Sequence, residues 1–540
     1  MPAVRSLGWS SMTVFANPVL PGMYPDPSVC RVGDTFYLAN SSFEYFPGLP
    51  LHSSTDLVTW TPLGHAIDRT GQAGLLDLAG VPDSGGLYAP TLRHHDGLFF
   101  LACTVVGGAA DASFFLTTTD PAGPWSDPVF LEGARGIDPT VFFHEGRVWW
   151  AGCRLVEPGA YPGQTEIWLR ELDPVAGRLF GQEHILWNGA VAGAVWAEGP
   201  HLFAHDGWIY LLAAEGGTER NHAVSVARSR SVTGPYVGNP GNPVLSHRQL
   251  GATASVQNVG HADLVEAGDG SWWALALGVR SRAGGHVLGR ETFLAPVAWE
   301  SGWPVVNPGA GRLGERGNTP FTSADAPTPA ELHDTFPVGP LAAHWLGVRG
   351  PVPGAHTSAA GLHLEPPAPP ALDPAGSTSA PRPATRTPAA FLGYRLRHPD
   401  VRAGLRLVLP YPGVTAGLAL RQSENFGLRI ELAHAPAGWT ATAIARADGA
   451  DTVLGSVPLD PVAPGSLLGL TAELSAAGVA FTVTVAGETR VVAVTDAALL
   501  TTERAGGFVG TVVGPFVSGE PGHPVTVTGF DYVPTASATP

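Results

Sequence analysis

The first three hundred residues repeat one pattern of apolar and polar positions. A short apolar strand, a polar turn with glycine and an aromatic strand recur in five segments. The segments are DPSVCRVGDTFYLANSS, APTLRHHDGLFFLACTVV, DPTVFFHEGRVWWAGCR, EGPHLFAHDGWIYLLAAEGG and HADLVEAGDGSWWALALGV, which start at Asp26, Ala89, Asp138, Glu198 and His261. These starts are 63, 49, 60 and 63 residues apart, and each span holds four short strands with their loops. The pattern predicts a five-bladed β-propeller; a β-sandwich with coincidental similarity is the alternative.

Each repeat also supplies a hairpin turn and a third strand. The turn sequences VGD, HDG, HEG, HDG and GDG separate the first two strands of the five repeats. Third strands follow as LHSST, FFLTTT, EIWLREL, AVSVARS and GRETFLAPV. One blade architecture accounts for all of these segments.

A different pattern begins near residue 330. The chain between 309 and 329 is rich in Gly, Pro, Thr and Ala, which is typical of a linker. Segments such as AGLRLVLP, FGLRIELA, VAFTVTVAG and VTVTGFDYV then alternate as half-buried antiparallel strands, which favours a β-sandwich. We therefore predict an all-β protein with an N-terminal extension over 1–15, a propeller over 16–308, a linker over 309–329 and a sandwich over 330–540.

Composition and charge support this interpretation and exclude several partners. The 69 Gly and 51 Pro among 540 residues favour many turns and few long helices. The net charge is −16, the chain has no lysine, and its arginines are scattered, so we expect no nucleic-acid partner. No run approaches the roughly 18 apolar residues of a membrane span, so we expect no membrane partner.

The cysteines and the N-terminus bear on location. Cys30, Cys103 and Cys153 lie in or beside apolar, strand-like runs, which predicts buried free thiols. The N-terminal stretch SLGWSSMTVFA mixes Trp, Ser and Thr and makes a poor signal-peptide core. We expect a cytoplasmic protein.

Three carboxylic acids open repeats of the propeller. Asp26, Asp138 and Glu198 stand in YPDPS, GIDPT and AEGPH, where the innermost strands begin. Because those strands surround one axis, the three side chains should converge. Glycoside hydrolysis needs a proton donor and a second carboxylate that activates water or attacks carbon, and a third acid would raise the donor's pKa. Asp-Pro is also a common turn opener, which is the structural alternative for each aspartate.

Other candidates surround these acids. His261 in GHAD could bind sugar or water, ligate a metal on the axis, or be a satisfied core histidine. Arg290 in LGRET has a planar fork suited to a carboxylate or to sugar hydroxyls, and an inner-wall salt bridge explains it equally well. The aromatic residues Phe43 and Tyr88 could stack on a sugar or pack in the core.

At these motifs the chain resembles glycoside hydrolase family 43, in particular its β-xylosidase and α-L-arabinofuranosidase members with a C-terminal sandwich of concanavalin-like type. The matching stretches include NPVLPGMYPDPSV, SSFEYFPGLP, GIDPTVF, AEGPHLF, AEGGTERNHAVSVARS, GHADLV and LGRETFLAPVAWESGWPVV. In the C-terminal part, HDTF, ENFGLRIEL and GGFVGTVVG resemble the sandwich of the same enzymes.

The resemblance implies roles for the three acids. Asp26 would be the general base, Asp138 the pKa modulator and orienter, and Glu198 the general acid. The implied reaction is inverting, exo-acting release of terminal β-D-xylose or α-L-arabinofuranose from xylo-oligosaccharides or arabinoxylan fragments, with no cofactor required for the chemistry.

The resemblance also implies the surroundings of the acids. Arg290 would contact the modulator and the substrate, Phe43 would line the sugar pocket, and His261 would lie near a water or a structural Ca²⁺ on the axis. Tyr88 stands where relatives often have Trp, and it keeps an aromatic ring there. Phe508, in GGFVG, would approach the active site, although this loop is one residue shorter than in some relatives.

Two rival functions are compatible with a propeller fold. A non-catalytic, carbohydrate-binding propeller would be favoured by the loss of an acid, and none is missing. A retaining furanosidase such as a fructan hydrolase would be expected to carry an Arg-Asp-Pro triplet, which the sequence lacks. The sequence leaves open the preference for xylose or arabinofuranose, the chain length of the substrate, whether a metal is bound, and whether the protein is a homo-oligomer.

Overall fold

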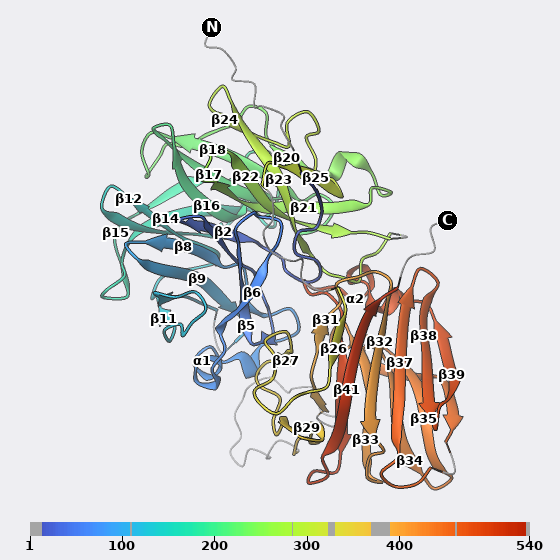
Figure 1. Cartoon of the computed structure of the whole chain (residues 1–540). Helices are drawn as coiled ribbons and strands as arrows, with labels where there is room; N and C mark the ends of the chain where they lie inside the picture. Colours follow the sequence, from blue (N-terminus) through green and yellow to red (C-terminus); the bar gives the residue numbers. More distant parts are fainter. Residues whose placement is uncertain are drawn as a thin grey trace. The chain divides into compact units, whose positions relative to one another are not determined.

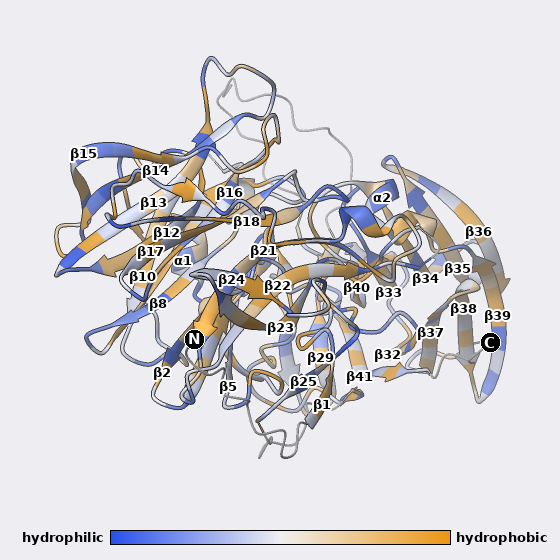
Figure 2. Ribbon diagram, turned by 90° about the horizontal axis from the view of Figure 1, so that it is seen from above, coloured by the Kyte–Doolittle hydropathy of each residue, from blue (hydrophilic) through white to orange (hydrophobic). Residues whose placement is uncertain are grey.

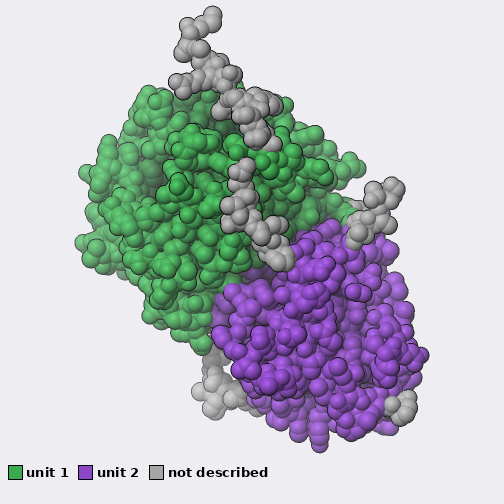
Figure 3. All heavy atoms as spheres, in the orientation of Figure 1, with its two compact units in different colours: residues 1–44, 48–284, 290–328 green, residues 45–47, 285–289, 329–540 purple. Residues whose placement is uncertain are grey.

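The computed structural model describes residues 13–108, 111–282, 284–321, 330–368, 389–459 and 462–535. The chain divides into two compact units, shown in different colours in Figure 3. Unit 1 comprises residues 1–44, 48–284 and 290–328, and unit 2 comprises residues 45–47, 285–289 and 329–540. The described residues are almost entirely strand and loop, as the sequence predicts.

Five antiparallel sheets of unit 1 form the blades, one for each sequence repeat (Figure 1). The first blade has the order β2–β3–β5–β6 and the third β12–β13–β14–β15. The strands of these two blades are β2 (Ser28–Val32), β3 (Thr35–Ala39), β5 (Gly48–Ser54), β6 (Thr61–Ile67), β12 (Ile137–His144), β13 (Arg147–Leu155), β14 (Thr165–Asp173) and β15 (Arg178–Trp187).

The other three blades follow the same plan with small additions. In the second blade β8 and β10 lie on either side of β9, and β7 also pairs with β9. The fourth blade has the order β16–β17–β18–β19, with β20 paired to β18. The fifth has the order β21–β22–β23–β24. Their bounds are β7 (Gly86–Leu87), β8 (Thr91–His95), β9 (Leu98–Val106), β10 (Ala112–Thr118), β11 (Val129–Phe130), β16 (Glu198–His205), β17 (Trp208–Glu215), β18 (Ala223–Ser229), β19 (Val237–Gly238), β20 (Leu245–Ser246), β21 (Val256–Glu266), β22 (Trp272–Arg280), β23 (Glu291–Glu300) and β24 (Trp303–Val306). The five-bladed propeller is confirmed.

The predicted hairpin turns lie at the ends of the innermost strands. In blades two, three and four the two-residue tips are Asp96-Gly97, Glu145-Gly146 and Asp206-Gly207. Both residues of each tip have positive φ, between 47° and 78°. This is the type I′ geometry that matches the twist of a two-residue hairpin, and glycine adopts it without a Cβ clash.

Apolar side chains between neighbouring blades form the core of unit 1. One buried cluster joins blades three and four through residues such as Trp149, Leu169 and Leu211, and another joins blades four and five through Tyr210 and Phe293. Figure 2 shows the contrast between the hydrophobic β22 and the more hydrophilic β15. Most residues of inner strands such as β13 and β22 are buried, whereas the outermost strand β15 has mainly exposed and half-buried residues.

The ends of the propeller sequence pair with each other. Strand β1 (Thr13–Ala16) is antiparallel to β25 (Arg316–Thr319), with Ala16 opposite Arg316. The Asn17 side chain donates to the carbonyl of Leu294 at 2.9 Å and accepts the amide of the same residue at 3.0 Å. The N-terminal segment is thereby fixed to the last blade.

A buried charged network links the inner strands of four blades. The Arg93 guanidinium donates to Asp263 at 2.8 Å and contacts Nδ1 of His201 at 3.1 Å. The Ser28 hydroxyl donates to the same Asp263 carboxylate at 3.0 Å. A buried charge is tolerated when it is paired and hydrogen-bonded, so this network can hold the inner strands together.

Unit 2 is a sandwich of two antiparallel sheets. One has the order β28–β29–β41–β32–β37–β38–β39 with β26 on β41, and the other β30–β40–β33–β34–β35–β36 with β31 on β40. The first sheet comprises β26 (Leu332–Asp334), β28 (His356–Ser358), β29 (Gly361–Leu364), β32 (Val401–Val408), β37 (Leu467–Ser475), β38 (Gly478–Val485), β39 (Glu488–Thr495) and β41 (Val525–Pro534). The second comprises β30 (Ala389–Phe391), β31 (Tyr394–Arg395), β33 (Val414–Arg421), β34 (Gly427–Ala435), β35 (Gly438–Ala447), β36 (Ala450–Pro458) and β40 (Val512–Gly519).

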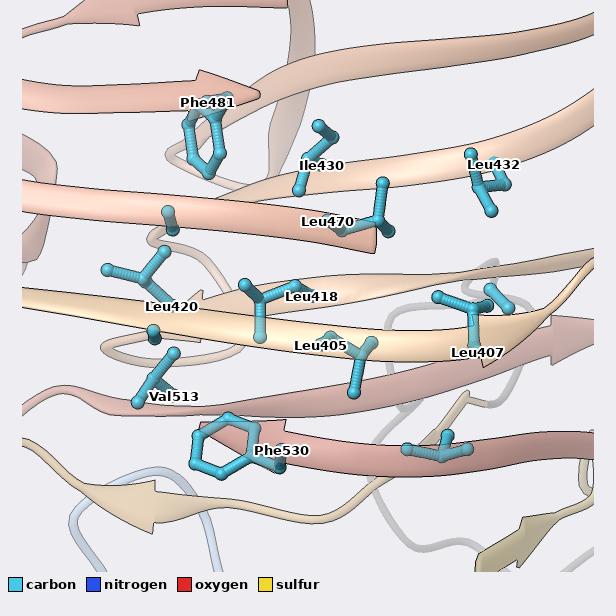
Figure 4. Close-up of a cluster of buried hydrophobic side chains, with 14 of the residues drawn as sticks. Leu405, Leu407, Leu418, Leu420, Ile430, Leu432, Leu470, Phe481, Val513 and Phe530 are labelled. Carbon is cyan, nitrogen blue, oxygen red and sulfur yellow. The ribbon is translucent and has the colours of Figure 1, made fainter. Parts of the chain in front are cut away.

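Alternating residues of these strands build the sandwich core. Strand β32 alternates buried with more exposed positions, and its Leu405 and Leu407 point inward with Leu418, Ile430 and Phe481 (Figure 4). The alternation is the one expected for strands with one face in a core. Most of the predicted crossover, residues 369–388, lies outside the described residues.

Two short segments from within the predicted propeller range belong to unit 2. Strand β4 (Tyr45–Phe46) pairs with β27 (Gly347–Val348). In the segment 285–289, the Val287 carbonyl accepts the amide of Thr511 at 2.9 Å. The remaining elements are α1 (Thr70–Leu75), α2 (Thr502–Ala505) and the 3-10 turns Leu78–Gly80, Arg248–Leu250 and Ala498–Leu500.

The structure also tests the cysteine prediction. All three cysteines are buried and unpaired, as predicted. Among the described residues, no helix has both the length and the apolarity needed to cross a membrane.

Candidate active site

The three predicted acids lie at or next to the starts of innermost strands. Asp26 precedes β2 by two residues, Asp138 is the second residue of β12, and Glu198 is the first residue of β16. Asp26 and Asp138 have left-handed backbones with φ of 53° and 54°. The strand register shifts just after Ile137 and just after Glu198. Such irregularities re-aim side chains and are concentrated at functional sites.

Asp26 is held as a carboxylate. Its Oδ2 accepts the Ser41 hydroxyl at 2.6 Å, and its Oδ1 accepts from the Arg290 guanidinium at 3.1 Å. Nδ1 of His261 lies 3.6 Å from the same Oδ1. Burial acts to raise the pKa of Asp26, but the Arg290 charge, His261 and the Ser41 hydrogen bond together hold it below the ordinary value.

The pKa values of the other two acids, Asp138 and Glu198, are raised instead of lowered. Burial, and then repulsion from the Asp26 charge, raise the pKa of Asp138 to about 7, although its Oδ2 accepts the Gly199 amide at 3.1 Å. Burial, followed by the charges of Asp138 and Asp26, holds the pKa of Glu198 well above its usual range. At neutral pH Asp26 is therefore ionised, Glu198 keeps its proton and Asp138 is divided between the two forms, a division that suits a base, a proton donor and a charge that modulates the donor.

Two aromatic residues and Arg290 stand beside these acids. The rings of Phe43 and Tyr88 meet edge to face with centroids 5.4 Å apart, and the Arg290 guanidinium lies 5.5 Å from the Phe43 ring centre. Burial, with the nearby charge of Asp138 next, raises the pKa of Tyr88 to about 12, so its phenol stays neutral. The structure thus brings Phe43, Tyr88 and Arg290 to the acids.

His261 reaches the site from a different place in its strand than the sequence predicts. It is the sixth residue of β21, which already begins at Val256, and not the first residue of the blade. Two register shifts, after Gln257 and after Gly260, let this longer strand turn His261 toward Asp26. Burial lowers the pKa of His261, and its Nε2 has no hydrogen-bond partner among the described residues.

Glycine at position 199 is required by close packing. A Cβ on Gly199 would lie 2.7 Å from Cε1 of His261, and the residue has a φ of 58°. Glycine therefore lets the Glu198 strand approach the histidine and lets its amide reach Asp138.

Sequence reasoning missed several contributors. The Ser41 hydroxyl donates a hydrogen bond to Asp26. His222, whose Nδ1 lies 3.1 Å from the Asn258 carbonyl oxygen, also acts to lower the Asp26 pKa. Both lie in stretches that carry the family resemblance, SSFEYFPGLP and AEGGTERNHAVSVARS. Neither opens a repeat, so the strand-start argument could not find them.

Comparison with known families agrees with this geometry. A model described as glycosyl hydrolases family 43 matches residues 15–304. The chain belongs to this family. A second model, described as the beta xylosidase C-terminal concanavalin A-like domain, matches residues 333–534.

Named relatives of this family-43 chain are xylosidases and arabinosidases. The chain is 47% identical over 306 residues to a xylosidase/arabinosidase of Butyrivibrio fibrisolvens, an alignment that covers 56% of this chain and 58% of that protein. It is 41% identical over 340 residues to a non-reducing end alpha-L-arabinofuranosidase of Bacteroides ovatus, covering 62% and 61%. The chain thus spans about three fifths of the length of the curated relatives it matches.

Solved structures extend the likeness over both units. A Bacteroides ovatus protein titled xyloglucan PUL GH43B has a TM-score of 0.84 at 31% identity, covering 97% of this chain and 100% of that one. A xylan beta-1,4-xylosidase from Bacillus halodurans has a TM-score of 0.85 at 28% identity, covering 96% and 100%. The concanavalin-like type predicted for the sandwich is confirmed.

The predicted calcium site near His261 would need oxygen donors. Calcium prefers six to eight oxygen ligands. Near the axis the histidine rings of His201, His222 and His261 leave nitrogen atoms buried without partners, and no group of three or more metal-binding side chains occurs in the described ranges. These residues do not build a calcium cage by themselves, and a structural Ca²⁺ near His261 stays a prediction.

Phe508 belongs to unit 2, between α2 and β40. Its role in the family-43 sugar site stays a prediction.

Replacing Glu198 by glutamine should stabilise the protein at alkaline pH. The folded state raises the Glu198 pKa, so it binds more protons than the unfolded chain between about pH 4 and the folded pKa, and stability falls as pH rises through that window. Glutamine removes this cost. We expect equal melting temperatures at pH 4 and a higher one for Glu198→Gln at pH 8.

The matched control is Glu145→Gln, at an exposed hairpin tip. It should change the melting temperature little at either pH. Glu198→Gln melting curves that differ from wild type equally at both pH values would contradict the assignment.

Proposed function

We propose that this protein is an inverting, exo-acting glycoside hydrolase that releases terminal β-D-xylose, α-L-arabinofuranose or both from xylo-oligosaccharides or arabinoxylan fragments. The observation that carries the proposal is the division of proton affinity among three adjacent acids. Arg290 and Ser41 stabilise the ionised form of Asp26, whereas Glu198 retains its proton. The names of the relatives support the pentose substrates.

In the proposed mechanism Asp26 activates water and Glu198 protonates the leaving oxygen. Asp138 stays next to Glu198, where its carboxylate accepts the Gly199 amide and its charge raises the proton affinity of the donor. Arg290, which already contacts Asp26, supplies donors for a sugar hydroxyl. Phe43 and Tyr88 supply the aromatic surface for the sugar ring.

The decisive experiment is hydrolysis of the two p-nitrophenyl pentosides, β-D-xyloside and α-L-arabinofuranoside. We expect release of p-nitrophenol from at least one of them. A protein that binds xylo-oligosaccharides but releases no product from either would instead be the non-catalytic binding propeller.

The stereochemistry follows from water activation by Asp26. An inverting enzyme holds its two carboxyl groups roughly 6.5–9.5 Å apart to leave room for water, whereas a retaining one holds them roughly 5–5.5 Å apart. We therefore expect proton NMR of the first-formed sugar to show the anomer opposite to that of the substrate. A product with the substrate's own configuration would exclude the assignment of Asp26 as base.

We also propose a cytoplasmic location. Three buried, unpaired cysteines suit a reducing compartment. Fractionation of the source cells tests this, and activity confined to the culture medium would contradict it.

A further inference from the structure

A tryptophan is exposed next to the proposed proton donor. Trp196 precedes Glu198 by two residues in the loop that leads into β16, and it is 39% exposed. It is the one tryptophan among the exposed large apolar side chains in the part of the chain that the structure describes. Two residues of chain span at most about 7 Å, so the Cα atoms of Trp196 and Glu198 are close.

The backbone of Trp196 is in an unfavourable conformation. Its φ is 57°, in the left-handed region. A bulky residue is rarely found there, and the conformation costs on the order of 1–2 kcal/mol for a non-glycine residue. Such a cost persists where the surrounding structure imposes it, and residues of this kind cluster at functional sites.

The surrounding structure does impose it. The Glu215 carboxylate accepts the amides of Ala190 at 2.8 Å and Val191 at 3.1 Å. Further along the loop, the Tyr161 hydroxyl donates to the Ala194 carbonyl at 3.0 Å. The Trp196 amide donates to the Gly163 carbonyl at 2.9 Å. The loop is fixed from both sides before any ligand arrives.

Two glycines lie against the indole. A Cβ on Gly163 would lie 3.5 Å from Cε2 of Trp196, and a Cβ on Gly217 would lie 3.5 Å from its Cδ1. These glycines come from two different loops, β13 to β14 and β17 to β18. The ring therefore packs against the main chain of two loops while more than a third of the residue stays open to solvent.

We propose that Trp196 is the stacking surface for the sugar on the leaving-group side of the scissile bond, and that this sugar is a pyranose such as xylopyranose. The inference rests on the proposed function. Because Glu198 protonates the leaving oxygen, the sugar attached to that oxygen lies beside the donor and its neighbours. A rigid aromatic face there binds the apolar face of a pyranose and makes oligosaccharides better substrates than compounds with a small leaving group.

The test separates the leaving-group side from the reacting sugar. β-D-xylosyl fluoride and α-L-arabinofuranosyl fluoride carry a leaving group too small to reach Trp196, whereas xylobiose and α-L-arabinofuranosyl-(1→3)-xylose carry a full xylose. For the accepted pentose, kcat/KM is measured on the fluoride and on the disaccharide. In Trp196→Ala the ratio of disaccharide to fluoride kcat/KM should fall about fivefold to tenfold, and Trp196→Tyr should restore most of it.

Two further variants make the result specific. Phe180→Ala removes an aromatic residue of similar exposure, 38%, from the outer strand β15, and it should leave the ratio unchanged. Trp196→Gly removes the same ring while glycine adopts the left-handed backbone freely, so its ratio should fall as in Trp196→Ala. An unchanged ratio in either variant overturns the proposal. Wild-type protein inactive on both fluorides would instead refute the proposed function.

Discussion

Replacing Glu198 by alanine is expected to reduce hydrolysis of xylo-oligosaccharides by about 10²–10⁴-fold while reducing hydrolysis of an activated aryl pentoside far less. A sugar leaves as an alkoxide unless it is protonated, whereas p-nitrophenolate is stable without a proton. Glu198 has the raised pKa and the partly exposed position of a proton donor. The measurement is kcat/KM on xylobiose and on p-nitrophenyl xyloside, or on the arabinose analogues.

The comparison has an internal control. Glu145→Gln, at the exposed tip of the β12–β13 hairpin, should leave both rates as they are in the wild type. If Glu198→Ala lost the same factor on both substrates, proton donation would have to be assigned to another group. Asp138, with a pKa of about 7, would then be the next candidate.

Replacing Asp26 should have an equally large effect of a different kind. Without the base, water attack slows for every leaving group, so Asp26→Ala should lose at least about 10³-fold on the oligosaccharide and the aryl pentoside alike. Because alanine removes the carboxylate that the buried Arg290 contacts at 3.1 Å, the protein should also lose about 3–5 kcal/mol of stability.

Asp26→Asn distinguishes catalysis from folding. The amide keeps an acceptor for Arg290, so the loss of stability should be smaller while the loss of rate persists. Asp34→Asn, on the exposed turn between β2 and β3, is the matched control and should be active. Rates that recover in Asp26→Asn would show that Asp26 is a structural partner of Arg290 and not the base.

The propeller could be predicted because the sequence pattern that specifies each blade lies within one short stretch of chain. Each blade repeats a strand, a two-residue turn and a second strand, and turns such as Asp96-Gly97 and Asp206-Gly207 require the residues that the sequence supplies. The convergence of Asp26, Asp138 and Glu198 then follows from the symmetry of the fold. The three acids could be named because they stand at or beside equivalent strand starts.

The electrostatic division among the acids could not be predicted, because it depends on distant partners. Arg290, which ionises Asp26, comes from the fifth blade, and Ser41 lies beyond the first hairpin. The position of His261 inside β21 depends on two register shifts that no local pattern signals. The loop that carries Trp196 is likewise held by Glu215, which accepts the Ala190 amide. In the sequence Glu215 is simply a polar residue at the end of a strand.

The pairing of β1 with β25 has a consequence for synthesis on the ribosome. Three hundred residues separate Ala16 from its partner Arg316. At about 5–20 residues per second, translation takes on the order of 15–60 s to supply that partner. During this interval β1 is a strand without its partner, and strands with unpaired backbone groups are common starting points of aggregation. The time during which the emerging polypeptide needs chaperone protection is therefore set by the codons between residues 16 and 316, so slower codons in this interval should lower the soluble yield.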